Sequence, residues 1–201
     1  MSPPDPLTRA LLPVLLHKLG NATQLLTGLN AMLSLEGGEE LFARRSPDLS
    51  RCALNLNELG WALAVVGSGA GGDLLLERRE PRGLSILLGL VGEACRRGGG
   101  VRIQPPADVP ALAPGTLSGW ELPWAAASLL LAAGEECDAE RLEWSLEPCD
   151  SGGWRMTLPG GQGLAACAGR VLPLLPGAEW SIDGGLGVLR LPATWLRSTG
   201  E

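Results

Sequence analysis

The chain contains a single histidine, His17, and the residue after it is the single lysine, Lys18. A neutral imidazole is a good nucleophile toward phosphoryl donors near pH 7, and a partner's active site can reach it when it stands exposed on a rigid helix. The alternative interpretation is an incidental surface histidine without chemistry. The surroundings of His17 along the chain therefore matter.

A helical wheel separates His17 from the apolar side of its segment. With about 100° per residue and Leu11 at zero, the apolar residues cluster near 0–80° and His17 falls at roughly 240°. Lys18 falls at roughly 340°, at the edge of the apolar stripe, where its stem can cover apolar surface. Three residues share the side of the imidazole and make its surroundings small and polar: Asn21, Gln24 and Gly28.

The elements that must position His17 are two long helices. Apolar residues recur at helical spacing over 7–35, where Pro13 either begins the regular part or kinks it. Ser46 and Pro47 offer an N-cap and a first-turn proline for a second helix. We expect this helix to turn one set of residues inward: Leu49, Cys52, Ala53, Leu56, Leu59, Leu63 and Val66. A lone helical hairpin cannot cover both apolar stripes, so we expect a homodimer with a four-helix bundle.

The second half of the chain contains both helix and strand patterns. We predict helices at 83–97 and 164–174, a strand at 101–104, two strands at 141–146 and 154–158, and a β-hairpin of 178–182 with 187–191. A capping box at 118–121 precedes a further helix. This order predicts an α+β fold, with helices on one face of a mixed sheet. We divide the chain into domains 1–72 and 73–201.

Residues 67–72, Gly-Ser-Gly-Ala-Gly-Gly, formally match the G-x-G-x-x-G phosphate-binding pattern after the apolar run 62–66, with Glu93 about 20 residues farther on. A dinucleotide-binding fold needs a strand before these glycines and a helix after them. The preceding residues follow a helical period, and Pro81 would stop a following helix. We therefore interpret the glycines as an interdomain linker.

Composition excludes several function classes. The 16 basic and 22 acidic residues give a net charge of -6, which argues against nucleic acid and anionic membranes as partners. The longest apolar run, 124–133, is too short to cross a bilayer, and the N-terminal stretch lacks a basic leader. Five cysteines without C-x-x-C spacing and one histidine form no zinc set, so we expect free thiols in the cytoplasm and no bound metal.

Three segments together resemble a known family. Residues 17–29, HKLGNATQLLTGL, resemble the phospho-acceptor helix of bacterial sensor histidine kinases. Residues 80–88 and 99–112 look like the opening of the kinase ATP-binding (GHKL) domain, and 163–192 look like its close. The resemblance spans nearly the whole chain in the right order, and it implies that His17 is the phospho-acceptor of a two-component system.

The departures from the kinase pattern fall where ATP is held. The resemblance places Ser128 and Ala132, in the helix at 124–136, where the kinases have magnesium-binding asparagines, and 159–163 lack the aspartate that reads adenine. Without these groups the triphosphate charge is uncompensated and adenine has no partner. Lys18 replaces the acidic residue after the acceptor histidine, and a cation cannot act as a carboxylate base.

The chain is thus similar to histidine phosphotransferases built as degenerate kinases, the dimeric family typified by ChpT. The resemblance implies that His17 shuttles a phosphoryl group between receiver-domain aspartates without autokinase activity, with Mg²⁺ supplied by the receiver. Asn21 and Lys18 would assist at the site, and Gly20, Gln24 and Gly28 would contact the receiver or a hybrid histidine kinase. The alternatives are a catalytically silent scaffold and a lobe that still binds a nucleotide by altered contacts.

Overall fold

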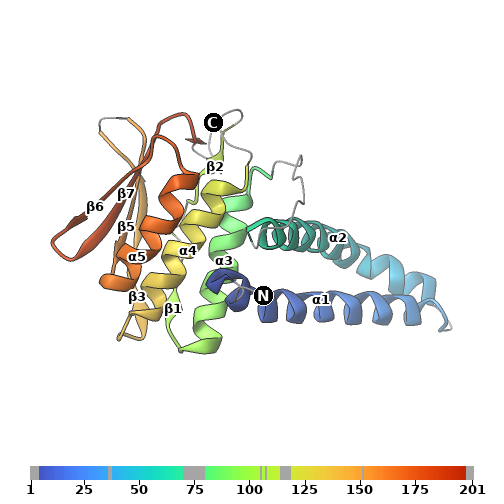
Figure 1. The fold of residues 1–201 in the computed structure, drawn as a ribbon. Helices are drawn as coiled ribbons and strands as arrows, with labels where there is room; N and C mark the ends of the chain where they lie inside the picture. The colour runs from blue at the N-terminus through green and yellow to red at the C-terminus, as the bar shows by residue number, and fades with distance from the viewer. Residues whose placement is uncertain are drawn as a thin grey trace.

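The computed structural model describes residues 5–35, 38–69, 80–104, 106, 108–113, 119–150 and 152–197, and it has the mixed α+β class that the sequence predicts. Two long helices, α1 (Pro6–Met32) and α2 (Gly38–Gly69), lie side by side, run in opposite directions and project from a layered part (Figure 1). The predicted domain boundary falls largely on residues 70–79, outside the described residues.

Helix α1 begins earlier than its proline suggested. Asp5 is the N-cap, its Oδ1 accepts a hydrogen bond from the Leu7 N–H at 2.9 Å, and Pro6 occupies the first helical position. Pro13 therefore lies inside the helix and does not begin it. The first half of α1 is anchored, because Leu7 and Leu11 are at most 1% exposed.

The prediction that α2 begins at Ser46 and Pro47 is wrong, because the helix begins at Gly38 and Pro47 lies within it. Residues 39–46 are mostly good helix formers. Two glutamates in the first turn stabilise the helix by their interaction with the positive end of its dipole. Of the residues expected to point inward, Cys52, Leu59 and Val66 are buried, whereas Ala53 and Leu63 are exposed in the single chain.

Helices α3 (Gly83–Gly98) and α4 (Glu121–Glu135) pack on each other, and β1 (Arg102–Ile103) pairs in parallel with β3 (Arg141–Leu142). The expected capping box before α4 is wrong. The N-cap is Trp120, which makes no side-chain cap hydrogen bond, and Glu121 is already the first helical residue. Ser118 lies outside the described residues.

The predicted mixed sheet is wrong, because the main sheet holds four antiparallel strands in the order β4-β5-β7-β6 and the parallel pair of β1 and β3 is a separate sheet. The strands of the main sheet are β4 (Ser145–Pro148), β5 (Trp154–Pro159), β6 (Glu179–Asp183) and β7 (Leu186–Leu191). The predicted hairpin of β6 and β7 is confirmed, and its turn needs glycine because Gly184 and Gly185 have φ of 56° and 85°. The strand predicted at 141–146 is instead two strands, β3 and β4, in different sheets.

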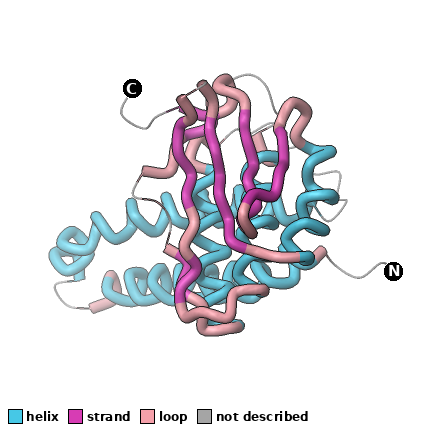
Figure 2. Tube along the Cα trace, turned by 90° about the vertical axis from the view of Figure 1, so that its left-hand side faces the viewer, coloured by secondary structure: helices cyan, strands magenta, loops and turns pink. Residues whose placement is uncertain are grey.

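The remaining elements complete a layered structure. Helix α5 (Gln162–Val171) continues into a 3-10 turn, η1 (Leu172–Leu174), and β2 (Ala111–Leu112) pairs with β8 (Leu196–Arg197). Figure 2 shows the main sheet in front of the helices, so α3, α4 and α5 lie on one side of it. One continuous core runs from Leu7 in α1 to Leu196 in β8, and α3 lies between α4 and the helical pair (Figure 1).

Candidate functional site

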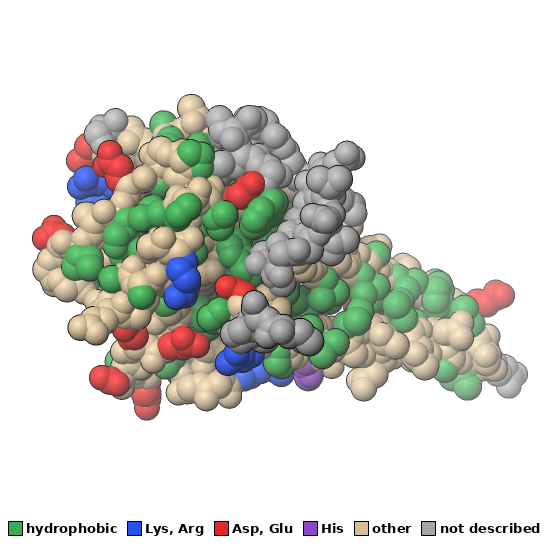
Figure 3. Space-filling view, viewed as in Figure 1, with side chains coloured by type: hydrophobic (Ala, Val, Ile, Leu, Met, Phe, Trp, Pro, Cys, Tyr) green, Lys and Arg blue, Asp and Glu red, His purple; other side chains and the backbone are tan. Residues whose placement is uncertain are grey.

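The side chain of His17 is exposed on α1, as the helical wheel predicts. Val14 and Leu15, on the other side of the same turn, are each 1% exposed and anchor this part of the helix in the core. Figure 3 shows the imidazole, in purple, at the surface with Lys and Arg side chains beside it. A partner molecule can therefore reach an imidazole that stands on a rigid support.

Asn21 lies one helical turn after His17 and contacts the imidazole. The distance between Asn21 Nδ2 and His17 Nε2 is 3.2 Å. An amide nitrogen can only donate, so this hydrogen bond needs an unprotonated Nε2 and places the proton of the neutral ring on Nδ1. The amide thus selects the tautomer whose Nε2 carries a lone pair, and that lone pair becomes a nucleophile when the amide moves aside.

The three residues predicted to contact a partner, Gly20, Gln24 and Gly28, are exposed on α1. A Cβ atom added at Gly20 or Gly28 would meet no other group within 4 Å. Packing within the single chain therefore does not demand a glycine at either position. The absence of a side chain at Gly20 leaves the surface of α1 open within one turn of the imidazole, and the absence at Gly28 leaves it open about three turns beyond the imidazole along the helix.

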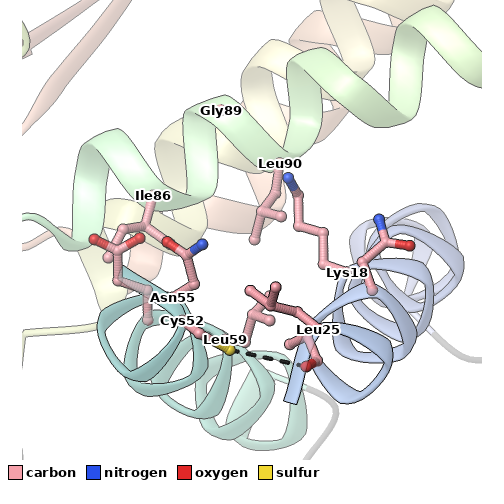
Figure 4. Close-up of a pocket in the computed structure, with 11 residues that line it drawn as sticks. Lys18, Leu25, Cys52, Asn55, Leu59, Ile86, Gly89 and Leu90 are labelled. Carbon is pink, nitrogen blue, oxygen red and sulfur yellow. Dashed lines mark hydrogen bonds between the residues drawn. The ribbon is translucent and has the colours of Figure 1, made fainter. Parts of the chain in front are cut away.

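Lys18 points away from the imidazole, toward α3. Its Nζ lies 2.9 Å from Oε2 of Glu93, whose other oxygen accepts a hydrogen bond from Arg97 Nη2 at 2.7 Å. Figure 4 shows the lysine side chain reaching from α1 toward α3 beside Leu90. Burial raises the pKa of Glu93, but the hydrogen bonds and charges of Lys18 and Arg97 outweigh it and leave the pKa below its ordinary value.

A cavity of about 450 Å³ lies between α1, α2 and α3 next to this ion pair. Lys18 and Asn21 contribute to its lining from α1, and Cys52 contributes from α2, where its Sγ lies 3.8 Å from the Ala22 carbonyl oxygen. Figure 4 shows its other labelled lining residues: Leu25, Asn55, Leu59, Ile86, Gly89 and Leu90. Glu58 also lines it and pairs with Arg82 Nη1 at 2.9 Å.

In the layered part of the molecule, a carboxylate of the chain itself binds the backbone N–H groups at the start of α5. The Glu136 oxygens accept hydrogen bonds from the backbone N–H groups of Gly161 at 2.8 Å, Gly163 at 2.6 Å and Leu164 at 3.2 Å. The amides of Gly161 and Gly163 hold the pKa of Glu136 below its ordinary value. Such amides at a helix N-terminus attract anions, and here an internal carboxylate already uses them.

The positions that correspond to the kinase asparagines, Ser128 and Ala132, line a cavity of about 400 Å³ between α4 and α5. Its charged lining consists of three carboxylates, those of Asp5, Glu135 and Glu136, and one cation, Arg170 of α5. Carboxylates repel a triphosphate unless a cation compensates them. Within the described residues, no group of three or more His, Cys, Asp or Glu side chains could hold a metal ion.

The dinucleotide alternative is wrong, because residues 62–66 belong to helix α2 where the pattern needs a strand. Ala70 and the two glycines after it lie outside the described residues. Glu93, which that alternative counted about 20 residues after the glycines, is bound by Lys18 and Arg97. The sequence held no signal for the Lys18–Glu93 pair, because its two residues come from different helices.

None of the helices in the described ranges combines the length and the apolar character that a bilayer crossing requires. No protein-family model matches the chain, and no curated protein matches it.

Proposed function

We propose that this chain is a phosphorelay histidine phosphotransferase. Nε2 of His17 accepts a phosphoryl group from an aspartyl phosphate of one receiver domain and passes it to the aspartate of another. The observation that carries the proposal is the exposed imidazole on an anchored helix, with Asn21 at 3.2 Å selecting the tautomer whose Nε2 is unprotonated.

The transfer is chemically balanced without a further reactant. The Nε2 lone pair forms the P–N bond while the acyl-phosphate P–O bond breaks, and the electron pair of that bond returns to the aspartate as a carboxylate. In the second transfer, the carboxylate of the next receiver attacks phosphorus and the imidazole leaves. The receiver supplies the Mg²⁺ that compensates the phosphoryl charge, and this chain supplies position and a nucleophile.

Two features support transfer without autokinase activity. Glu136 already occupies the backbone amides at the start of α5, and carboxylates line the cavity beside them. The start of α1 is also packed into the shared core, with Leu7 and Leu11 at most 1% exposed. A kinase must bring its nucleotide to the histidine, and this packing opposes such a movement.

The proposal includes a homodimer in which the two copies of α1 and α2 form a four-helix bundle. Figure 3 shows hydrophobic side chains on the projecting part. Ten leucines of these helices and of the turn after α1 are exposed in the single chain: Leu12, Leu16, Leu19, Leu25, Leu26, Leu33, Leu35, Leu41, Leu54 and Leu63. A second copy would cover this apolar surface. We assign residues 1–72 to this bundle and 73–201 to a degenerate relative of the kinase ATP-binding (GHKL) domain, in a cytoplasmic protein.

The test is transfer from a receiver domain that carries a labelled phosphoryl group. We expect label on the wild-type chain and none on His17→Ala, which removes an exposed side chain and should leave the fold intact. Circular dichroism and light scattering check the fold and the mass of both proteins. If no cognate receiver labels the wild-type chain, the phosphotransferase proposal is wrong and the catalytically silent scaffold becomes the better account.

Incubation with labelled Mg-ATP separates transfer from autokinase activity. We expect neither label on His17 nor saturable heat of binding by calorimetry, because the residues that would hold the triphosphate and adenine are absent or occupied. Saturable binding of Mg-ATP would support the alternative in which the lobe holds a nucleotide by altered contacts.

A further inference from the structure

The residue next to the candidate phospho-acceptor is tied to a different helix. Lys18 Nζ lies 2.9 Å from Glu93 Oε2, and Arg97 binds the other oxygen of the same carboxylate at 2.7 Å. The Glu93 side chain is 17% exposed and that of Lys18 is 40% exposed. A half-buried carboxylate on α3 thus holds the α1 turn that carries His17 and Asn21.

The direction in which Lys18 points decides where its charge lies. Neighbouring residues on a helix project about 100° apart, so the lysine can reach α3 while the imidazole faces solvent. A free lysine side chain is long and flexible, and its ammonium can donate hydrogen bonds to any acceptor within its reach. An unprotonated Nε2 is such an acceptor, so a released Lys18 would compete with Asn21 for it.

We propose that Glu93 is a positioning residue for phosphoryl transfer at His17. It holds Lys18 against α3, and by doing so it keeps the ammonium away from Nε2 and fixes the turn of α1 on which the His17–Asn21 hydrogen bond depends. This inference rests on the proposed function, and it assigns to α3 a part in the site that the sequence near His17 does not contain.

A second ion pair in the same cavity provides a matched control. Arg82 Nη1 lies 2.9 Å from Glu58 Oε1, with side-chain exposures of 61% and 23%. This pair joins α2 to the N-cap of α3 and also borders the cavity, but it does not involve α1. Because both pairs are partly exposed and screened by water, we expect the loss of either one to leave the chain folded.

The experiment compares Glu93→Gln and Lys18→Met with Lys18→Arg and the control Glu58→Gln. Single-turnover transfer from a phosphorylated receiver is measured over a range of receiver concentrations. We expect the first two variants to lower the maximal rate about tenfold, because small misplacements of a reacting group have large effects, with the half-saturating receiver concentration unchanged. We expect Lys18→Arg, which keeps the ion pair, and Glu58→Gln to stay within about twofold of wild type.

Two further measurements separate position from reactivity. Direct phosphorylation of His17 by phosphoramidate needs no docked partner, so we expect Lys18→Met, Lys18→Arg and Glu58→Gln to stay within about twofold of wild type. Nitrogen NMR of the single imidazole reads the tautomer directly. We expect Lys18→Met to raise the share of ring carrying its proton on Nε2, because the Asn21 hydrogen bond loosens when the α1 turn is freed and no ammonium is left to donate to Nε2.

The outcomes are distinguishable. If the wild-type chain accepts no label from any receiver, the proposed function fails, and the tautomer measurement alone then decides whether Glu93 positions the ring. If the wild-type chain is labelled and Glu93→Gln transfers at the same rate, the positioning role is wrong. Equal slowing by Glu58→Gln would overturn it as well, because general loosening of the cavity would then explain the effect. If Glu93→Gln fails to fold, Lys18→Met carries the same test.

Discussion

Glu136→Ala removes a carboxylate that accepts three backbone hydrogen bonds at the start of α5. The distances are 2.8 Å from Gly161, 2.6 Å from Gly163 and 3.2 Å from Leu164, so the carboxylate of the residue that follows α4 binds the free N–H groups of α5 as an N-cap side chain would. Loss of an N-cap side chain costs about 1 kcal/mol, and a negative charge at a helix N-terminus adds about 0.3–1 kcal/mol. Because Glu136 is exposed and water can replace its carboxylate, we expect the free energy of unfolding to fall by no more than about 1–2 kcal/mol.

This effect should depend on pH with a definite sign. The folded-state pKa of Glu136 lies below the ordinary value of 4.5, so its charged form stabilises the fold at pH values above the unfolded pKa. That contribution is lost as the pH falls through the folded pKa. We therefore expect the difference between wild type and Glu136→Ala to be complete at pH 7 and to shrink steadily below about pH 4.5.

Urea unfolding followed by circular dichroism, at one fixed protein concentration, measures the difference at each pH. At pH 7 a loss of this size also lowers Tm by roughly 2–8 °C for a chain of this length. Glu135→Gln, at the neighbouring exposed position of α4, is the matched control and should change stability by less than about 0.5 kcal/mol. Equal stability of wild type and Glu136→Ala at pH 7, or a difference that persists unchanged at low pH, would refute the capping argument.

Three other predictions test the acceptor site, the core and the thiols. Asn21→Asp replaces a donor by an acceptor and therefore favours a proton on Nε2 of His17. We expect this variant to slow single-turnover phosphoryl transfer at least tenfold. An unchanged rate would contradict the role given to the amide. Leu87→Ala, at a position of α3 that is 0% exposed, should cost about 2–5 kcal/mol in urea unfolding, and a loss below about 1 kcal/mol would mean that α3 is not packed as described. Burial, with the charge of Glu135, raises the pKa of Cys95 to about 11. We therefore expect iodoacetamide at pH 8 to alkylate Cys95 much more slowly than the less buried Cys149, as followed by peptide mass spectrometry. Equal rates of alkylation would disprove this.

Local pattern was a reliable guide where one short stretch of chain determines the outcome. The period of apolar residues in α1 placed His17 on the exposed side, and the glycines between β6 and β7 marked a turn that needs positive φ. The bounds of α3 were predicted within one residue. Local pattern failed where two local signals competed: the helix formers at 39–46 let α2 begin upstream of the start that Ser46 and Pro47 suggested.

The sequence by itself determined that this protein has an α+β fold, a long amphipathic first helix and one imidazole on the polar side of that helix, because periodicity and composition act over neighbouring residues. Only the tertiary structure decided that Lys18 binds Glu93 on α3 and that Glu136 caps α5. Charges on separate helices carry no mutual spacing in the sequence, and only the packing of α1, α3, α4 and α5 into one core brings them within hydrogen-bond distance.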